Sequence, residues 1–144
     1  MKWLFTALIC FSLAGCSRDP SGADLQFAQD SFPVLARGDA KAEELIDFET
    51  LRMAGMDVGA VYAAMPNDKE KADFRRSFVV GFASSFQGTG ASADSFKNWR
   101  VQNSDSARTV VATDGPKGVI TITVSRRDDR QRISGLGIAP MATP

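Results

Sequence analysis

The sequence predicts an α+β domain in which N-terminal helices pack on a curved, four-stranded antiparallel sheet. From residue 25 to residue 87, apolar residues recur every three or four positions, which is the period of an amphipathic helix. From Phe96 onward the apolar period becomes two, as in half-buried strands, and polar turn sequences separate the apolar runs. Helices followed by a series of strands are typical of the α+β class.

The N-terminal segment has the pattern of a secretory signal. Lys2 is followed by about eleven apolar residues from Trp3, fewer than the ~20 that a membrane-spanning helix needs. The next residues, Leu13-Ala14-Gly15-Cys16, resemble the lipobox of bacterial lipoproteins. This resemblance implies that the Cys16 thiol receives a diacylglyceryl group and that the chain is cut just before Cys16. An ordinary signal peptide, or an apolar helix with a chance cysteine, is the alternative.

The lipobox resemblance also implies a location and a domain organisation. Two or three acyl chains on one residue make release from a membrane negligible. By the sorting rule of the lipoprotein family, Ser17 after the lipidated cysteine directs the protein to the periplasmic face of a Gram-negative outer membrane. In a Gram-positive source the location would be the cell membrane. We therefore assign residues 1–15 to a signal peptide, 16–24 to a lipidated tether, 25–139 to the domain and 140–144 to a tail.

The composition of the chain excludes several chemistries. There is no His, the usual general base and commonest metal ligand, which rules out Ser-His-Asp and Cys-His catalysis and His-based zinc sites. Cys10 leaves with the signal and Cys16 carries lipid, so no disulfide is expected. The 17 basic residues balance the 17 acidic ones, which gives no global attraction to nucleic acid. We expect no cofactor, no metal site and no nucleic-acid partner.

Several helices are expected before the strands. Helical spacing starts at Leu25, and Pro33 interrupts it, so we expect a kink or a fresh start near Ser31. Gly38 is a typical helix stop. Further helices are expected over residues 40–53, after a cap at Asp57, and from a cap at Asn67 to about Gln87.

The last of these helices carries a stripe of phenylalanines at positions 74, 78, 82 and 86, one turn apart. Each Phe can bury about 150–250 Å², so such a stripe will not stay exposed. Two interpretations are open: a core stripe packed on the sheet, or the wall of an apolar cavity. We expect Phe78 to belong to the core and at least one of Phe82 and Phe86 to face a cleft.

Strands are expected in the last third of the chain. Val119 to Val124 is the clearest, because Ile120 and Ile122 alternate with threonines. The other strands are expected around Trp99 and Val101, over Arg108 to Thr113, and over Gln131 to Ile138, where Gly135 and Gly137 allow a bulge.

This order of elements is similar to the cystatin-like roll of the NTF2-like superfamily. The run from Ala36 to Asp47 resembles the helix junction of many small lipoproteins of that type. A weaker likeness, through Asp47-Phe48-Glu49 and the Phe-rich helix, is to periplasmic phospholipid-shuttle proteins of the Mla type. Such shuttles are soluble, whereas this chain carries an anchor motif. The superfamily resemblance implies a cone-shaped fold with an apolar cleft between the sheet and the long helix, a scaffold that hosts both enzymes and binders.

Two classes of function follow from these observations. The first is a non-enzymatic, membrane-anchored envelope module that binds an apolar ligand, such as a phospholipid, or a protein partner. Its candidate ligand-binding residues are Tyr62, Phe78, Phe82, Phe86 and Trp99, in addition to lipidation at Cys16. The second is an enzyme that uses Tyr62 with a buried carboxylate, drawn from Asp30, Asp47, Glu49 and Asp57. A cavity holding Tyr62 and a buried Asp would favour the enzyme, whereas an apolar, open cavity would favour lipid carriage.

Charge is distributed unevenly along the chain. Residues 97–144 contain eight basic and four acidic groups, whereas residues 17–96 contain eight and 13. The simplest interpretation is two solvated surfaces that attract each other. The alternative is that the arginines at positions 126, 127, 130 and 132 meet anionic lipid phosphates, although Asp128 and Asp129 lie among them.

Overall fold

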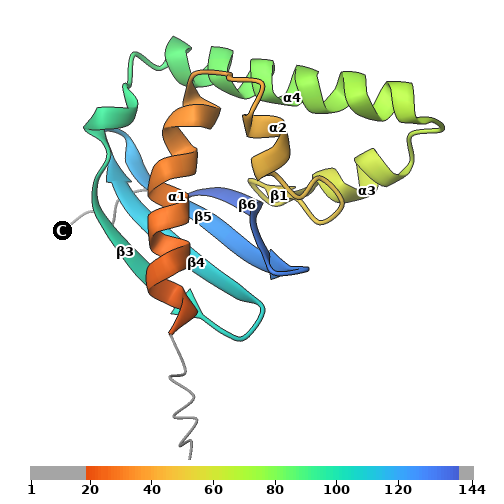
Figure 1. Ribbon diagram of the computed structural model, residues 1–144. Coiled ribbons are helices and arrows are strands. Elements are labelled where there is room, and N and C mark those ends of the chain that lie inside the picture. Colours follow the sequence, from red (N-terminus) through yellow and green to blue (C-terminus); the bar gives the residue numbers. More distant parts are fainter. Residues whose placement is uncertain (1–18, 140–144) are drawn as a thin grey trace, which may run out of the picture.

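A computed structural model describes residues 19–139 and shows an α+β arrangement, with the helices gathered on one face of a sheet (Figure 1). The helices are α1 (Pro20–Ala36), α2 (Ala42–Leu45), α3 (Val58–Ala63) and α4 (Asp68–Gly88), followed by the 3-10 turn η1 (Ala93–Ser95). The strands are β1 (Arg52–Met53), β2 (Met56–Asp57), β3 (Lys97–Ser104), β4 (Arg108–Gly115), β5 (Gly118–Arg127) and β6 (Arg130–Ala139). The predicted signal peptide, Cys16, Ser17 and the tail at 140–144 lie outside the described residues.

The sheet has six strands in the order β2-β1-β6-β5-β4-β3. The four predicted strands form the expected antiparallel meander, but the prediction of a purely antiparallel four-stranded sheet is wrong. The short strand β1 pairs in parallel with β6 and in antiparallel with β2. Ala54 and Gly55 connect β1 to β2 with φ values of 49° and 83°, as a tight two-residue hairpin requires. Strands of two residues are too short to produce a periodic pattern, and for that reason the sequence did not reveal them.

The helix predicted over residues 40–53 is also wrong, because only Ala42–Leu45 is helical. After it, the chain runs beside the sheet: Ile46 forms a parallel bridge with Ile133, and the Asp47 amide donates to the Ile133 carbonyl at 2.9 Å. Phe48 and Leu51 are buried in the core. Their spacing resembles a helical face, but sheet pairing satisfies the backbone and buries the same side chains in an extended conformation.

Helix α1 begins at Pro20, five residues before the predicted start, and runs through Pro33 without a break. Part of the segment assigned to the tether is therefore helical. Asp19 caps this helix by accepting a hydrogen bond from the Ser21 amide at 3.0 Å. The predicted stop is confirmed, because Gly38 has a φ of 69° and ends the turn after α1.

The predicted caps at Asp57 and Asn67 are confirmed. Asp57 Oδ1 accepts from the Ala60 amide at 2.9 Å at the start of α3. Asn67 Oδ1 accepts from the Glu70 amide at 2.9 Å, and the Asn67 side-chain amide donates back to Glu70 Oε1 at 3.2 Å. This reciprocal pair fixes the start of α4, the helix that carries the phenylalanines.

The core lies between α1 and the inner face of the sheet. Phe32 is fully buried and its ring contacts the rings of Phe86, Phe96 and Trp99, with centroids 4.9–5.8 Å apart. On β5, Ile122 and Val124 are fully buried on the same face, as their alternation with threonine predicts. A register shift between β5 and β6 lies beside Gly135, which confirms the expected bulge.

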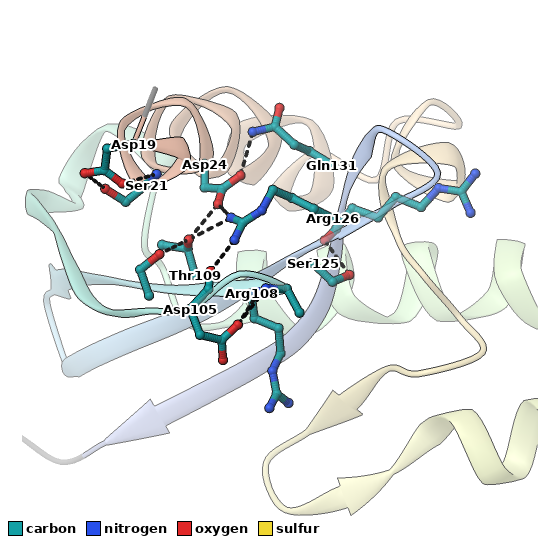
Figure 2. Close-up of polar contacts among 12 residues, drawn as sticks. Asp19, Ser21, Asp24, Asp105, Arg108, Thr109, Ser125, Arg126 and Gln131 are labelled. Atoms are coloured by element: carbon teal, nitrogen blue, oxygen red, sulfur yellow. Dashed lines mark hydrogen bonds and ion pairs between the residues drawn. The ribbon is translucent and has the colours of Figure 1, made fainter. Parts of the chain in front are cut away.

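A buried polar cluster fastens the first turns of α1 to the sheet (Figure 2). Asp24 is fully buried and accepts hydrogen bonds from the Thr109 hydroxyl at 2.6 Å and from the Gln131 amide at 2.7 Å. The Arg126 guanidinium pairs with the same carboxylate and also donates to the Asp105 carbonyl. Three strands therefore hold one carboxylate of α1, and Arg126 is committed to this internal ion pair.

Candidate ligand-binding cavity

An apolar cavity of about 650 Å³ lies between α4 and the end of the sheet where β4 turns into β5. Its walls are mainly large apolar side chains. They come from α4 (Phe78, Phe82, Phe86), from the β1–β2 hairpin (Met53) and from the sheet (Ile120, Leu136, Ile138). Volumes of about 300–1,000 Å³ are usual for small-molecule sites. The cavity is therefore large enough for a ligand of metabolite or single-acyl-chain size.

A row of small residues on α4 leaves room for this cavity. Ser77, Gly81 and Ser85 are spaced four apart, so they form one stripe beside the phenylalanine stripe, and all three line the cavity. A Cβ atom built on Gly81 would meet no atom within 4 Å. The helix is held against the core by Val79 and Ala83, which are buried, so the small stripe on the other face of the helix is exposed at the open side of the cavity.

Glycines shape the sheet side of the cavity. Gly115, the last residue of β4, lies against the Phe96 ring, where an added Cβ would come within 2.3 Å of a ring atom. Gly137 on β6 lies against Thr121 in the same way, at 2.4 Å. Larger residues at either position would push their neighbours away, so the strands can pack closely around the end of the cavity only because these glycines are present.

The lining is poor in charge. Among the described lining residues, Lys117 on the β4–β5 turn is the one with an ionisable side chain, and it is exposed. Ile138 at the end of β6 is 75% exposed, so the rim of the cavity is apolar as well. This arrangement suits a hydrocarbon body with at most one anionic group near Lys117.

The structure brings together three of the five predicted ligand-binding residues. Phe78, Phe82 and Phe86 line the apolar cavity and are all half-buried. Phe78 was expected in the core, but it faces the cavity and at the same time contacts the Phe48 ring, with centroids 5.6 Å apart. Trp99 is not among the lining residues, because it packs on Phe32 inside the core.

Tyr62 lies on a second, more polar cavity of about 910 Å³. It is 9% exposed, its ring packs near Phe48, and its hydroxyl accepts a hydrogen bond from Arg75 at 2.7 Å. Asp47 lines the same cavity and is 4% exposed; its Oδ1 accepts from the Glu49 amide at 3.3 Å. Tyr62 therefore does share a cavity with a buried carboxylate, as the enzyme hypothesis requires.

Several arginines also line the polar cavity. Arg127 Nη1 lies 3.0 Å from Glu49 Oε2 and 4.0 Å from Asp47 Oδ2. The Glu49 hydrogen bond and charge raise the pKa of the Arg127 guanidinium, with a smaller contribution from Asp47. Arg130 and Arg132 line the cavity as well. Acidic and basic groups are thus mixed there, which favours a polar or zwitterionic ligand over a purely anionic one.

The remaining carboxylates of the enzyme hypothesis have structural roles. Asp57 caps α3, and Asp30 accepts a hydrogen bond from Gln26 on the exposed side of α1 at 3.0 Å. Neither lines the cavity that contains Tyr62.

Sequence reasoning missed several cavity residues. Met53, Ile138 and the β4–β5 turn come from segments far apart in the chain, and no local pattern links them. The spacing of Ser77, Gly81 and Ser85 was the available signal, because three small residues beside a phenylalanine stripe indicate a helix face without packing partners.

Comparison of the chain with known protein families, curated proteins and solved structures gave no match. Within residues 19–139, no helix is both long and apolar enough to cross a membrane. The same residues contain no group of three or more His, Cys, Asp or Glu side chains arranged to hold a metal ion. The proposals below therefore depend on the geometry of the two cavities and on the N-terminal motif.

Proposed function

We propose that this protein is a lipid-anchored envelope lipoprotein whose domain binds an apolar ligand non-enzymatically. The observation that carries the proposal is the 650 Å³ cavity, whose apolar walls include three phenylalanines of α4. The cavity is open to water, and apolar side chains in contact with water forgo the free energy of burial, so its walls contribute less to stability than a filled core would. Keeping small residues at positions 77, 81 and 85 beside large ones is consistent with a site kept open for a ligand.

The lipobox at Leu13–Cys16 supports the anchor part of the proposal. Cys16 would carry the lipid, and Ser17 would direct the protein to the periplasmic face of a Gram-negative outer membrane, or to the cell membrane of a Gram-positive source. The fold proposed is the cone-shaped NTF2-like roll. In its support, a long helix covers one end of the sheet and an apolar cavity lies between them.

The proposed ligand is a slender amphiphile with an anionic head, such as a fatty acid or one chain of a phospholipid. The walls fit its hydrocarbon body, and the exposed Lys117 at the lining fits its head group. One ammonium group near the mouth of the cavity contributes some affinity and orients the ligand, whereas burial of the ligand's apolar surface contributes most of the binding free energy. This is the ligand class that the likeness to phospholipid shuttles also suggests.

Native mass spectrometry tests the proposal directly. The chain starting at Ser17, purified without detergent from a bacterial host, is expected to carry a co-purified lipid that dissociates at higher collision energy. A chain that is consistently free of ligand, and that also binds no added fatty acid, would contradict the proposal.

A matched pair of glycine substitutions makes the test specific for the cavity. Gly81→Leu places an apolar side chain at the exposed side of the cavity lining and should weaken ligand binding strongly while preserving the fold. Gly22→Leu is the control, because Gly22 also lies in a helix with nothing near its Cβ position but is remote from the cavity lining. Both changes replace an exposed helical glycine with a good helix former; because Gly22 lies in the first turn of α1, its gain in helix stability should be the smaller of the two.

A second candidate function is favoured by one observation, the shared cavity of Tyr62 and Asp47. In this alternative the protein is an enzyme in which the buried carboxylate and the phenol exchange protons with a polar substrate. Screening hydrolase and isomerase substrates against wild type, Tyr62→Phe and Asp47→Asn tests it. Loss of activity in both variants, with unchanged melting temperature, would favour the enzyme. Turnover that survives in one variant would show that the residue substituted in it is not required for catalysis.

A further inference from the structure

The connection between the proposed lipid and the folded domain is very short. Only three residues separate Cys16 from Pro20, where α1 begins. At about 3.3–3.6 Å per residue, even a fully extended chain spans at most ~14 Å between these two residues. The start of α1 is therefore confined to the immediate neighbourhood of the bilayer in which the Cys16 chains are anchored.

The start of α1 is also fixed rigidly to the rest of the domain. Asp24, one turn into the helix, is buried and bound by Thr109, Arg126 and Gln131 (Figure 2). The tether therefore confines the whole domain and not a loose N-terminal arm, because α1 cannot lift off the sheet without breaking this buried ion pair.

A second segment lies at the same end of the domain. The β3–β4 turn, Asp105–Ala107, is joined to Arg126 through the Asp105 carbonyl and through the Arg126 amide, which donates to the Ala107 carbonyl at 2.9 Å. We call the first turn of α1 together with this β3–β4 turn the anchor end. Figure 1 shows both at the lower side of the domain.

The apolar cavity lies at the opposite end of the same strands. Strand β4 starts at Arg108, beside the anchor end, and finishes at Gly115, which lines the cavity. Seven steps of about 3.3 Å place these two residues roughly 23 Å apart. The β4–β5 turn, the C-terminal end of α4 and the residues that flank η1 line the cavity at this far end, which we call the cavity end.

The side chains differ between the two ends. The anchor end exposes polar and charged residues, among them Asp105 and Ser106, and Arg108 next to it is exposed as well. The exposed large apolar residues of the described chain are Met56, Val61, Val80, Val101 and Ile138, and none of these belongs to the anchor end. A polar surface suits the lipid headgroup layer, into which apolar side chains need not insert.

We infer that the anchor end rests on the lipid headgroups and that the cavity end points away from the bilayer, so that the ligand enters and leaves from the aqueous side. The inference rests on the proposed anchor at Cys16. It extends the proposed binding function by stating which way the mouth of the apolar cavity faces. A domain oriented in this way exchanges ligand with a soluble or opposing partner rather than with the membrane that holds it.

Energy transfer to dye-labelled headgroups measures this orientation. Ser106→Cys and Ser92→Cys place a donor dye at exposed serines of the anchor end and the cavity end, respectively. The lipidated full-length protein is reconstituted into phosphatidylethanolamine–phosphatidylglycerol vesicles that contain a headgroup-labelled acceptor lipid. Transfer from position 106 should exceed transfer from position 92 several-fold. Equal transfer, or greater transfer from position 92, would overturn the inference.

A tether variant tests the cause of the orientation. A long Gly-Ser linker inserted between Ser17 and Arg18 frees the domain, so transfer from position 106 should fall towards that from position 92. Undiminished transfer from position 106 would overturn the short-tether argument. Protein that fails to float with the vesicles would overturn the anchor and the orientation together. Ligand binding in the mass spectrometer is independent of these readouts, so failure of the binding proposal is recognised separately.

Discussion

The Asp24 Oδ2 oxygen accepts a 2.6 Å hydrogen bond from the Thr109 hydroxyl, although 85 positions separate the two residues. Arg126 and Gln131 complete the cluster, so each of three successive strands contributes one partner to a single carboxylate. Among the described residues, no buried side-chain nitrogen or oxygen lacks a hydrogen-bond partner. A buried, fully partnered ion pair is sensitive to the loss of either member.

We expect Asp24→Ala to lower the free energy of unfolding by about 3–5 kcal/mol, because it leaves the Arg126 guanidinium largely buried without a counter-charge. Urea denaturation of the chain starting at Ser17 measures this loss. Asp30→Ala on the exposed side of the same helix is the control and should change the free energy by less than about 0.5 kcal/mol. Similar small losses in both variants would show that the cluster contributes little to stability.

The phenylalanines should rank by how completely they are packed. Phe32→Ala, in the fully buried centre of the core, should cost about 3–5 kcal/mol. Phe82 is half-buried, lines the cavity and stacks only on Phe86 among the described rings, so Phe82→Ala should cost about 1 kcal/mol. Phe78→Ala and Phe86→Ala should lie between these values, because each contacts a buried ring.

Denaturant titrations of the four alanine variants decide this ranking, and binding of a hydrophobic dye provides a second readout. Dye binding should change in Phe82→Ala and remain at the wild-type level in a folded Phe32→Ala protein. If all four variants lost similar, large amounts of stability, the cavity would be part of a filled core and the main support for ligand binding would disappear.

Cys16→Ser should leave the protein without lipid, because the hydroxyl does not replace the thiol that the lipobox presents. Metabolic labelling with an alkyne fatty acid measures lipidation, and Cys10→Ser is the matched control that should retain the label. Undiminished label in Cys16→Ser would contradict the proposed anchor and, with it, the proposed orientation.

Acid should weaken the β3–β4 turn. The Asp105 carboxylate accepts hydrogen bonds from the Ala107 and Arg108 amides at 2.7 and 2.8 Å, and these bonds hold its pKa below the ordinary value of 3.8. Because the folded pKa is the lower one, this stabilisation is complete above the unfolded pKa and is lost as the pH falls through the folded pKa.

The test compares the wild type with Asp105→Asn, which keeps an acceptor oxygen but does not titrate. Between about pH 5 and about pH 2, stability should fall more steeply in the wild type than in the variant. A carboxyl titration followed by NMR should give a midpoint below 3.8 for Asp105. A midpoint at or above that value would show that the two amide bonds do not persist in solution.

The sequence by itself determined the elements whose signals are local. The α+β class, the caps at Asp57 and Asn67, the stop at Gly38 and the four strands of the meander were predicted, because periodicity and capping chemistry act within a few residues. The phenylalanine stripe was visible for the same reason, and so was the lipobox, which lies outside the described residues.

Only the tertiary structure decided which of these side chains meet. Residues 46–53 are not helical as predicted, because pairing with β6 buries Phe48 and Leu51 as well as a helix would. No local pattern in the sequence shows which of the two conformations is the more stable. Asp24 belongs to the folded domain and not to the predicted tether, because Thr109, Arg126 and Gln131 bind its carboxylate. These partners lie more than eighty positions along the chain, so no local pattern could predict the contact. The cavity likewise depends on how α4 packs on α1 and α2: Val79 and Ala83 are buried there, and the small residues on the opposite face of the helix are left exposed at the open side of the cavity.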